Sequence, residues 1–407
     1  MRSYPRFQIT KKAERSVRAG HPWVYGEEIV AVDGAYANGN LVDVVTLKGK
    51  YLGTGFVNDH SKIRVRLLSR NANDRFDEAF WERRLRYAID YRRTVMPGRD
   101  FRCCRLIFGE ADQFPGLTVD RYNDLLVTQT LSLGIEVRKD VLFPLLAKVL
   151  RDMGETVTGI YERNDVKIRA LEGLEQGKGW YALPGEPVPA SPVTTIDENG
   201  ILYDVDVENG QKTGFFLDQK YNRQSVARIA AGKQVLDCFT HTGSFALNAA
   251  KGGAAHVTAV DVSAEACRMT KGNAAKNGVA DIVDVEQADV FELLDRLEAD
   301  HVTAYDFIIL DPPAFTKSRK TVHNATAGYK DINQKAMKLL PRGGYLATCS
   351  CSHFMTEDLF LAMLRDAARD ADVTLRQVEA RQQAPDHPIL WNVPETAYLK
   401  FYIFQVV

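Results

Sequence analysis

From residue 234 to the end of the chain, short apolar runs alternate with stretches of helical periodicity. The apolar runs include 234–237, 256–261, 305–310 and 344–349. Amphipathic stretches separate them at 243–252, 264–277, 290–297 and 329–340. This alternation is typical of β-α-β units, which build a parallel sheet covered by helices on both faces. The pattern therefore predicts a doubly wound, Rossmann-like α/β domain over residues 190–407, finished by a strand at 397–406.

Residues 1–72 show a different pattern, in which glycines separate short β-branched runs. These runs lie at 41–46, 51–57 and 63–67. They predict a small β-barrel. Basic and apolar residues alternate along the third run, so a strand places Lys62, Arg64 and Arg66 on one face. A basic strand face suits contact with phosphate groups, and it equally suits an edge strand that charge keeps in solution.

Residues 73–185 mix both patterns and predict a compact α+β domain. Residues 74–96 predict an amphipathic helix with Asp74 as its N-cap, and a second helix is expected at 135–153. The proline-rich stretch 183–192 predicts a stiff connection to the last domain. After it, Asn199-Gly200 predicts the turn of a hairpin between 193–198 and 201–208.

Composition narrows the class of protein. The chain has 407 residues, 45% of them hydrophobic and 26% charged, which is an ordinary globular balance. The first residues have no apolar signal core, and no stretch approaches the roughly 18 apolar residues of a membrane span. Six cysteines occur without a CxxC pair, which favours reduced thiols over disulfides or zinc. We therefore expect a cytoplasmic protein that binds no membrane and no metal; its oligomeric state stays open, with a homodimer among the states allowed.

The charge is unevenly distributed. Residues 1–110 contain 21 Lys and Arg against 13 Asp and Glu, whereas the whole chain has a net charge of −1. A basic N-terminal part beside an acidic C-terminal part is typical of a module that docks on a polyanion and carries a catalytic domain. An arginine-rich solvated surface gives the same count, so this asymmetry alone decides nothing.

The carboxyl ends of the strands in the last domain carry candidate ligand-binding residues. Open α/β sheets bind their ligands beyond these ends. Asp237 ends the first strand and is followed by Thr242 and Gly243, where the turn lets the backbone approach a ligand. Asp261, at the tip of the second strand, can accept both ribose hydroxyls of an adenosine, and Asp289, after the third, can accept from an adenine amino group.

A nicotinamide dinucleotide would use the same acidic tip. Its fingerprint, however, needs three glycines to accommodate the pyrophosphate, and this turn has only Gly243. A cofactor without phosphates fits better, which favours S-adenosyl-L-methionine. Each acid taken alone is equally compatible with a helix cap.

The segment 305–315 combines a buried strand with an acid and two prolines. Asp311 follows the strand, and Pro312 and Pro313 then fix the backbone. Such a loop can present the Asp311 carboxylate to a flat, flipped base, on which Phe315 can stack. The alternative is that Asp-Pro-Pro only terminates the strand.

Two thiols follow at the end of the next strand. Cys349 and Cys351 lie one residue apart at the predicted sheet edge. A pyrimidine C5 is too weak a nucleophile to take a methyl group directly, but a thiolate that adds to C6 makes C5 enolate-like. A cysteine here is therefore what C5 methylation requires. A small buried hydrophobic residue is the alternative role, and either thiol is a candidate nucleophile.

Several segments together resemble the RlmI-type ribosomal RNA large-subunit cytosine-C5 methyltransferases. They are 109–120, 210–219, 237–246, 260–263, 310–315, 328–333, 350–352 and 383–388. The similarity runs nearly end to end, and the combination is specific. It implies an N-terminal PUA domain that binds RNA, a central α+β domain and a C-terminal Rossmann-like methyltransferase domain that uses S-adenosylmethionine.

The resemblance also implies roles for individual residues. Cys351 matches the nucleophile, and Asp311-Pro312-Pro313 matches the base-binding loop. Residues implied to enclose the cofactor are Thr213, Phe216, Asp218, Asp237, Thr242, Gly243, Asp261, Ser263 and Asp289. The RNA partner that the resemblance implies is large-subunit ribosomal RNA. Lys62, Arg64 and Arg66, on the basic strand face described above, are the residues expected to contact it.

Two other functions compete with C5 methylation. Methylation of an exocyclic amino group uses similar Asp-Pro-Pro loops but needs no cysteine, so thiol dependence separates the two reactions. An RNA-binding assembly protein with an inactive methyltransferase fold is the third reading, and the acids at 237, 261, 289 and 311 argue against it.

Overall fold

The computed structural model describes residues 4–316 and 318–407, which fold into two compact units. The first unit holds the chain up to Ile196 together with Asp204–Leu217 and Pro385–Thr396. The second holds Asp197–Tyr203, Asp218–Ala384 and Ala397–Val407. The chain thus returns to the first unit twice after Ile196. The division into domains at 1–72, 73–185 and 190–407 stays a prediction.

A six-stranded sheet in the order β2-β6-β5-β4-β1-β3 occupies the N-terminal part of the first unit, as the β-branched runs predict. Its strands are β1 Arg6–Ile9, β2 Trp23–Tyr25, β3 Ile29–Asp33, β4 Leu41–Val45, β5 Tyr51–Val57 and β6 Ile63–Ser69. The helix α1, Lys11–Arg18, buries Ala13 and Val17 in the same core as Phe7 and Val65. Thr10 caps α1 by accepting from the Ala13 N–H at 3.2 Å.

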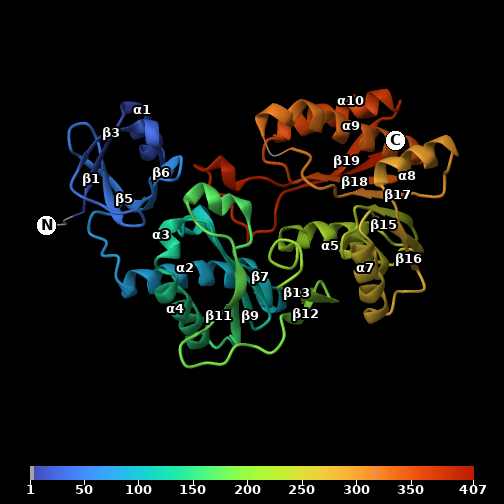
Figure 1. The fold of residues 1–407 in the computed structure, drawn as a ribbon. Coiled ribbons are helices and arrows are strands. Elements are labelled where there is room, and N and C mark those ends of the chain that lie inside the picture. The colour runs from blue at the N-terminus through green and yellow to red at the C-terminus, as the bar shows by residue number, and fades with distance from the viewer. Residues whose placement is uncertain (1–3, 317) are drawn as a thin grey trace. The chain divides into compact units, whose positions relative to one another are not determined.

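The rest of the first unit is an α+β region around a five-stranded sheet, β11-β10-β9-β8-β7. The strands are β7 Cys103–Phe108, β8 Leu117–Tyr122, β9 Leu125–Thr130, β10 Gly159–Arg163 and β11 Lys178–Tyr181. Helices α2, Glu78–Val95, and α4, Lys139–Asp152, pack against each other beside it (Figure 1). The two-stranded hairpin β12, Val193–Glu198, and β13, Ile201–Asp206, has positive φ at Asn199 and Gly200, as its turn sequence predicts.

Two predicted helix boundaries are wrong. The helix expected from residue 74 begins at Glu78, because the Asp77 carboxylate accepts from the Phe80 N–H and caps it. Asp74 instead accepts from the Ser69 hydroxyl at 2.5 Å, before the helix. The single helix expected at 135–153 is two: α3, Leu133–Glu136, ends where the Arg138 N–H bonds to the Ile135 carbonyl, and α4 follows.

The second unit is a doubly wound sheet in the order β16-β15-β14-β17-β18-β20-β19, which confirms the predicted class. The strands are β14 Gln234–Cys238, β15 His256–Asp261, β16 Val283–Gln287, β17 Phe307–Leu310, β18 Tyr345–Ser350, β19 Leu375–Arg381 and β20 Lys400–Val406. The first five run parallel, and β20 lies antiparallel between β18 and β19. The order reverses between β14 and β17, which is the point where such sheets bind ligands.

Helices cover both faces of this sheet (Figure 1). On one face lie α5 Lys220–Ile229, α6 Ser244–Lys251 and α7 Ala264–Lys276; on the other lie α8 Val290–Ala299, α9 Val322–Leu339 and α10 Glu357–Asp370. The core between the sheet and the second set includes Leu236, Ile308, Ile332 and Phe360. Strand β19 was not predicted, because its alternating polar residues sit at an edge and are largely exposed. In the described chain, no helix is both long and apolar enough to cross a membrane.

Candidate active site

Asp237 occupies the carboxyl end of β14 and is fully buried. Its Oδ2 atom accepts from the Thr240 hydroxyl at 2.6 Å and from the Ala246 N–H at 2.9 Å. Burial raises the pKa of Asp237 to about 7, and the nearby Asp311 and Asp261 carboxylates add to the shift, against the two hydrogen bonds. The Asp237 carboxylate therefore links the turn after β14 to the first residues of α6.

The turn after β14 depends on Gly243. Gly243 has φ +78°, a left-handed conformation that side chains rarely adopt. A Cβ there would lie 2.6 Å from Cγ2 of Thr270, so the position is closed by packing as well. The Thr242 carbonyl accepts from the Asn273 amide at 2.9 Å, and the turn is thereby fixed to α7.

Asp261 and Ser263 lie together at the end of β15. The two carboxylate oxygens accept from the backbone N–H groups of Ser263 and His241, each at 2.9 Å. Ser263 caps α7 by accepting from the Ala266 N–H at 3.3 Å. Each carboxylate oxygen has a second acceptor site, so the Asp261 carboxylate is oriented by backbone and retains capacity for ribose hydroxyls.

Asp289 is the N-cap of α8, where it accepts from the Phe291 N–H at 2.8 Å and the Glu292 N–H at 3.3 Å. Its exposed carboxylate is thus a helix cap, the alternative role for an acid after a strand. Contact with an adenine amino group stays a prediction for this residue.

The residues at the ends of β14 and β15 fit an adenosine-type cofactor. Oδ1 of Asp237 and Oγ1 of Thr242 are buried polar atoms for which the described residues supply no hydrogen-bond partner. A buried polar atom without a partner costs free energy, which a ligand that donates to it or accepts from it offsets. Thr242 belongs to the turn that Gly243 closes, and Asp237 lies at the end of the strand that leads into this turn. S-adenosylmethionine offers ribose hydroxyls, an ammonium and a carboxylate for such a turn.

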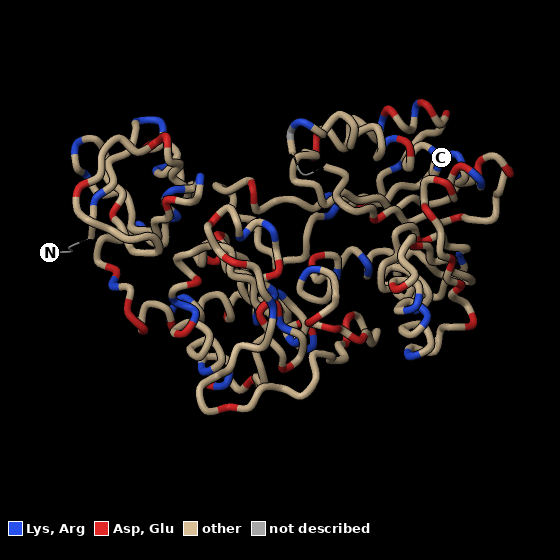
Figure 2. The backbone as a smooth tube through the Cα atoms, in the orientation of Figure 1, with Lys and Arg blue, Asp and Glu red and all other residues tan. Residues whose placement is uncertain are grey.

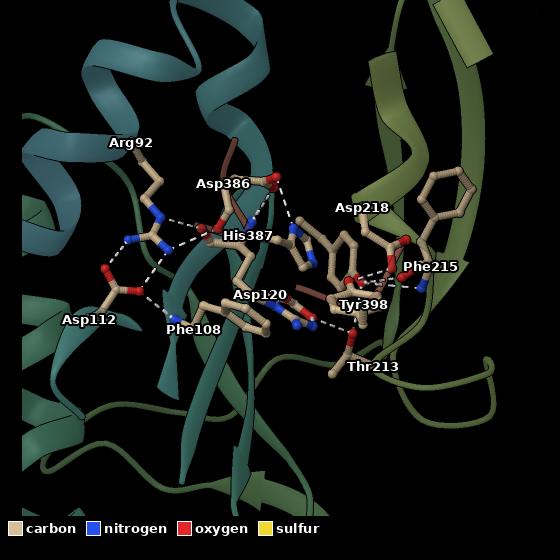
Figure 3. A network of polar contacts seen from close by, with 12 residues as sticks. Arg92, Phe108, Asp112, Asp120, Thr213, Phe215, Asp218, Asp386, His387 and Tyr398 are labelled. Atoms are coloured by element: carbon tan, nitrogen blue, oxygen red, sulfur yellow. Dashed lines mark hydrogen bonds and ion pairs between the residues drawn. The ribbon is translucent and has the colours of Figure 1, made fainter. Parts of the chain in front are cut away.

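Thr213 and Phe216 lie in the first unit, and Asp218 lies in the second. The Thr213 hydroxyl is buried and donates to the Asp120 carboxylate at 2.5 Å; it also pairs with the Tyr122 hydroxyl at 3.0 Å (Figure 3). The Lys212 ammonium lies 4.1 Å from the Phe216 ring centre. Asp218 accepts from the Tyr398 hydroxyl at 2.7 Å. The cofactor role that the resemblance implies for these three residues stays a prediction.

The Asp311 loop follows β17 as the sequence predicts. Oδ1 of Asp311 accepts from the Gln219 amide at 3.1 Å and from the Cys349 thiol at 2.9 Å. Pro312 is buried and Pro313 is exposed. The Asp311 carboxylate is therefore held from two sides, by Gln219 just before α5 and by Cys349 in β18. The two prolines that follow it restrict the backbone of the loop.

Phe315 is half-buried and packs under the loop. Its ring lies 4.5 Å from the Tyr329 ring centre and 5.9 Å from that of Phe291. Stacking of this ring on a substrate base stays a prediction, and the observed contacts also make it part of the core beside α9.

The two candidate thiols differ in environment. Cys349 is buried inside β18, and its thiol donates to the Leu310 carbonyl at 3.3 Å as well as to Asp311. Burial, together with the Asp311 carboxylate, raises the pKa of the Cys349 thiol well above its usual value. Cys351 lies just past the end of β18 and is the only one of the six cysteines that is not buried. A reactive cysteine needs access, and Cys351 is the one of the six cysteines that is not buried; its role as nucleophile stays a prediction.

The Tyr329 hydroxyl, which is buried, holds both residues that flank Cys351. The Ser350 hydroxyl donates to the Tyr329 hydroxyl at 3.0 Å, and the Tyr329 and Ser352 hydroxyls pair at 3.1 Å. Lys400 on β20 donates to the Ser352 carbonyl at 2.7 Å. Tyr329, Lys400 and Gln219 were not singled out from the sequence. Tyr329 and Gln219 lie inside the segments 328–333 and 210–219 that carry the family resemblance. That resemblance was the signal in the sequence that could have pointed to these two residues.

The predicted basic face of β6 is largely paired. Arg66 bonds to Glu110 at 3.0 Å and to Glu172 at 2.8 Å, and Arg64 pairs with Asp59. Lys62 is exposed. Figure 2 shows basic positions of the N-terminal region lying among acidic ones. Phosphate contact stays a prediction for all three, and for Arg66 it competes with two half-buried or buried carboxylates.

A buried network of hydrogen bonds and ion pairs inside the first unit was not predicted from the sequence. Arg92 pairs with Asp112 and donates to the Asp386 carbonyl at 2.9 Å, and the Asp386 carboxylate accepts from the Arg105 N–H at 2.8 Å (Figure 3). Arg105 in turn holds Asp120, whose pKa its charge keeps below the usual value despite burial. The network fixes the returning segment Pro385–Thr396 to β7 and α2.

Comparisons with known proteins agree with this fold. Residues 7–70 match the family described as a PUA-like domain, and residues 177–405 match the S-adenosylmethionine-dependent methyltransferase family. The chain is 43% identical to the ribosomal RNA large subunit methyltransferase I of Shewanella denitrificans, over 98% of this chain and 99% of that protein. It is 38% identical to the protein of the same name from Klebsiella pneumoniae, over 99% of both.

Two solved structures share the fold over nearly the whole chain. SMU.776, solved complexed with SAH, superposes with a TM-score of 0.81 over 98% of this chain and 100% of its own, at 21% identity. A Streptococcus mutans chain gives the same TM-score at 22% identity. At such identities the similarity concerns the fold alone.

Proposed function

The chain belongs to the S-adenosylmethionine-dependent methyltransferase family that includes the ribosomal RNA large subunit methyltransferase I proteins, and from that premise we propose that it methylates C5 of a cytosine in large-subunit ribosomal RNA. The observation that carries the proposal is the position of Cys351. It is the accessible thiol, and it follows β18, which pairs in register with β17 so that Leu310 lies opposite Thr348. The thiol and the Asp311 loop therefore end at the same edge of the sheet.

Cys351 would have the central task in C5 methylation. The Cys351 thiolate adds to C6 of the cytosine. The electron pair of the C5–C6 double bond moves toward C5, which becomes nucleophilic. S-adenosylmethionine supplies an electrophilic methyl group. C5 would take that methyl group as the methyl–sulfonium bond breaks and S-adenosylhomocysteine is left. A base would then accept the C5 proton, and the Cys351 sulfur would depart from C6 as thiolate. The double bond is restored, and the enzyme is returned unchanged.

Asp311 has a separate task in this scheme. Its carboxylate is oriented by Gln219 and Cys349 beside two prolines, so it can accept from the cytosine amino group and hold the ring edge-on. Asp237, Thr242, Gly243, Asp261 and Ser263 would hold the cofactor, and Asp289 would limit its adenine end. The N-terminal region would contact the RNA, with Lys62 at its exposed edge.

Methylation of an exocyclic amino group remains the competing reaction, favoured by the Asp311-Pro312-Pro313 loop. The discriminating experiment transfers labelled methyl groups to large-subunit RNA that lacks modification, followed by nucleoside analysis of the digested RNA. The proposal predicts 5-methylcytidine as the labelled nucleoside. An N-methylated base would contradict it, and a failure to bind S-adenosylmethionine would support an inactive assembly protein instead.

A further inference from the structure

Lys400 is a buried ammonium group beside the candidate nucleophile. In the register of β18 and β20, Lys400 lies opposite Ser350, one residue before Cys351. Its Nζ atom donates to the Ser352 carbonyl at 2.7 Å and to the Tyr398 carbonyl at 2.8 Å. An ammonium group has three N–H donors, so these two carbonyls occupy two of them. The Lys400 ammonium thus lies against the backbone that follows Cys351 at the end of β18.

The charge on Lys400 needs an anionic partner. Burial lowers the pKa of Lys400 to about 8, and the Cys351 thiolate opposes this shift more strongly than Glu357 or Cys349 does. Glu357, on α10, already accepts from the Tyr402 hydroxyl. Cys349, on β18, keeps its proton because burial and Asp311 raise its pKa. Cys351 and Glu357 thus both favour the charged lysine, and of the two only Cys351 belongs to the candidate active site.

The backbone around Cys351 is rigid enough for this coupling to persist. Ser350 and Ser352 both bond to the hydroxyl of the fully buried Tyr329, and the Ser352 N–H bonds back to the Ser350 hydroxyl at 3.3 Å. The Cys351 peptide is thus held between two anchored neighbours, while Lys400 fixes the next carbonyl. Preorganised charge of this kind acts without reorganisation during the reaction.

We propose that Lys400 is a positioning residue that stabilises the thiolate of Cys351 and so prepares it to attack the base. The inference rests on the proposed function, in which Cys351 is the nucleophile. An interaction that favours the charged lysine beside the thiolate favours the thiolate equally. The same site thereby separates its two cysteines: an ammonium favours ionisation of Cys351, and a carboxylate opposes ionisation of Cys349.

The test measures the alkylation rate of Cys351 by iodoacetamide between pH 6 and 9.5, without RNA or S-adenosylmethionine. Mass spectrometry of the peptide isolates Cys351, and the five other cysteines are buried. We expect the wild type to react with an apparent thiol pKa below the usual value of about 8.5. Lys400→Met should raise that pKa and slow alkylation at pH 7 by about tenfold, as expected for a shift of roughly one unit.

Two further variants separate an electrostatic from a structural role. Lys400→Arg keeps the positive charge and should retain most of the low thiol pKa. Lys338→Met removes the charge of an exposed lysine on α9, whose ammonium pairs with Glu298, and should leave the profile unchanged. Thermal unfolding of each variant checks that the second unit is folded. If Lys400→Met does not fold, the wild-type and Lys400→Arg profiles decide.

The proposal is overturned if wild-type Cys351 alkylates with an ordinary thiol pKa, or if Lys400→Met leaves its pH profile in place. These outcomes are independent of the reaction product. A lowered thiol pKa that depends on Lys400, found together with an N-methylated nucleoside, would contradict the proposed function and retain the role of Lys400. Formation of 5-methylcytidine together with an ordinary pKa of the Cys351 thiol would support the proposed function and contradict the role of Lys400.

Discussion

Replacing Asp237 with asparagine tests whether a buried, ionisable carboxyl lies beneath the cofactor turn. Both hydrogen bonds that Asp237 accepts, from Thr240 and Ala246, go to the same atom, Oδ2. An asparagine whose carbonyl oxygen takes that place keeps both bonds, and its amide nitrogen replaces the buried Oδ1, for which the described residues supply no partner. The substitution therefore removes the ionisation while preserving the local structure.

The magnitude follows from the pKa. Burial raises the pKa of Asp237 from 3.8 to about 7, so the folded protein binds a proton that the unfolded chain releases between these values. The contribution of Asp237 to stability is thus lost as pH rises through this window. A shift of about three units corresponds to at most about 4 kcal/mol. Relative to wild type, Asp237→Asn should gain up to that amount in free energy of unfolding between pH 4 and pH 8.

Urea unfolding at a series of pH values measures this difference. All four tryptophans, at 23, 81, 180 and 391, lie in the first unit, so their fluorescence follows the unfolding of that unit. Circular dichroism follows both units and should show the change. A difference between variant and wild type that stays constant from pH 4 to pH 8 would refute the argument from burial.

Three further substitutions test other parts of the account. Gly243→Ala, at φ +78° and with its Cβ 2.6 Å from Thr270, should destabilise the second unit by at least about 1 kcal/mol and weaken S-adenosylmethionine binding in calorimetry; unchanged binding and melting would contradict the packed turn. Arg66→Met should cost about 3 kcal/mol of stability in urea unfolding, because it removes the positive charge that pairs with the Glu110 and Glu172 carboxylates. Lys62→Ala should leave stability unchanged and reduce the salt dependence of RNA binding by about one phosphate contact. If Arg66→Met instead keeps its stability and loses RNA affinity, phosphate contact is the main role of Arg66.

The fold of the second unit could be predicted because its strands are buried on both faces. Runs such as 305–310 contain nearly uninterrupted apolar residues, and the helices between them keep helical periodicity. Strand β19 escaped prediction because an edge strand needs only one neighbour and tolerates alternating charge. The N-cap of α2 was placed three residues early, since Asp74 and Asp77 are both suitable caps and only the hydrogen bond from the Phe80 N–H distinguishes them.

The candidate site could be located but not completed from the sequence. Parallel strands bring their carboxyl ends to one edge, so Asp237, Asp261 and Asp311 were expected there from strand periodicity alone. The sequence left open which cysteine is accessible, because that depends on where β18 ends. Lys400 reaches the site only through the antiparallel pairing of β20 with β18, and local patterns carry no information about such long-range pairing.

The most direct test of the central claim is trapping of the covalent adduct. RNA containing 5-fluorocytidine offers no C5 proton to remove, so an enzyme that attacks C6 stays bonded to the base after methyl transfer. The account predicts a denaturant-resistant protein–RNA complex, dependent on S-adenosylmethionine, with wild type and with Cys349→Ala, and none with Cys351→Ala. A complex that persists in Cys351→Ala, or 5-methylcytidine formation by that variant on ordinary RNA, would contradict the account.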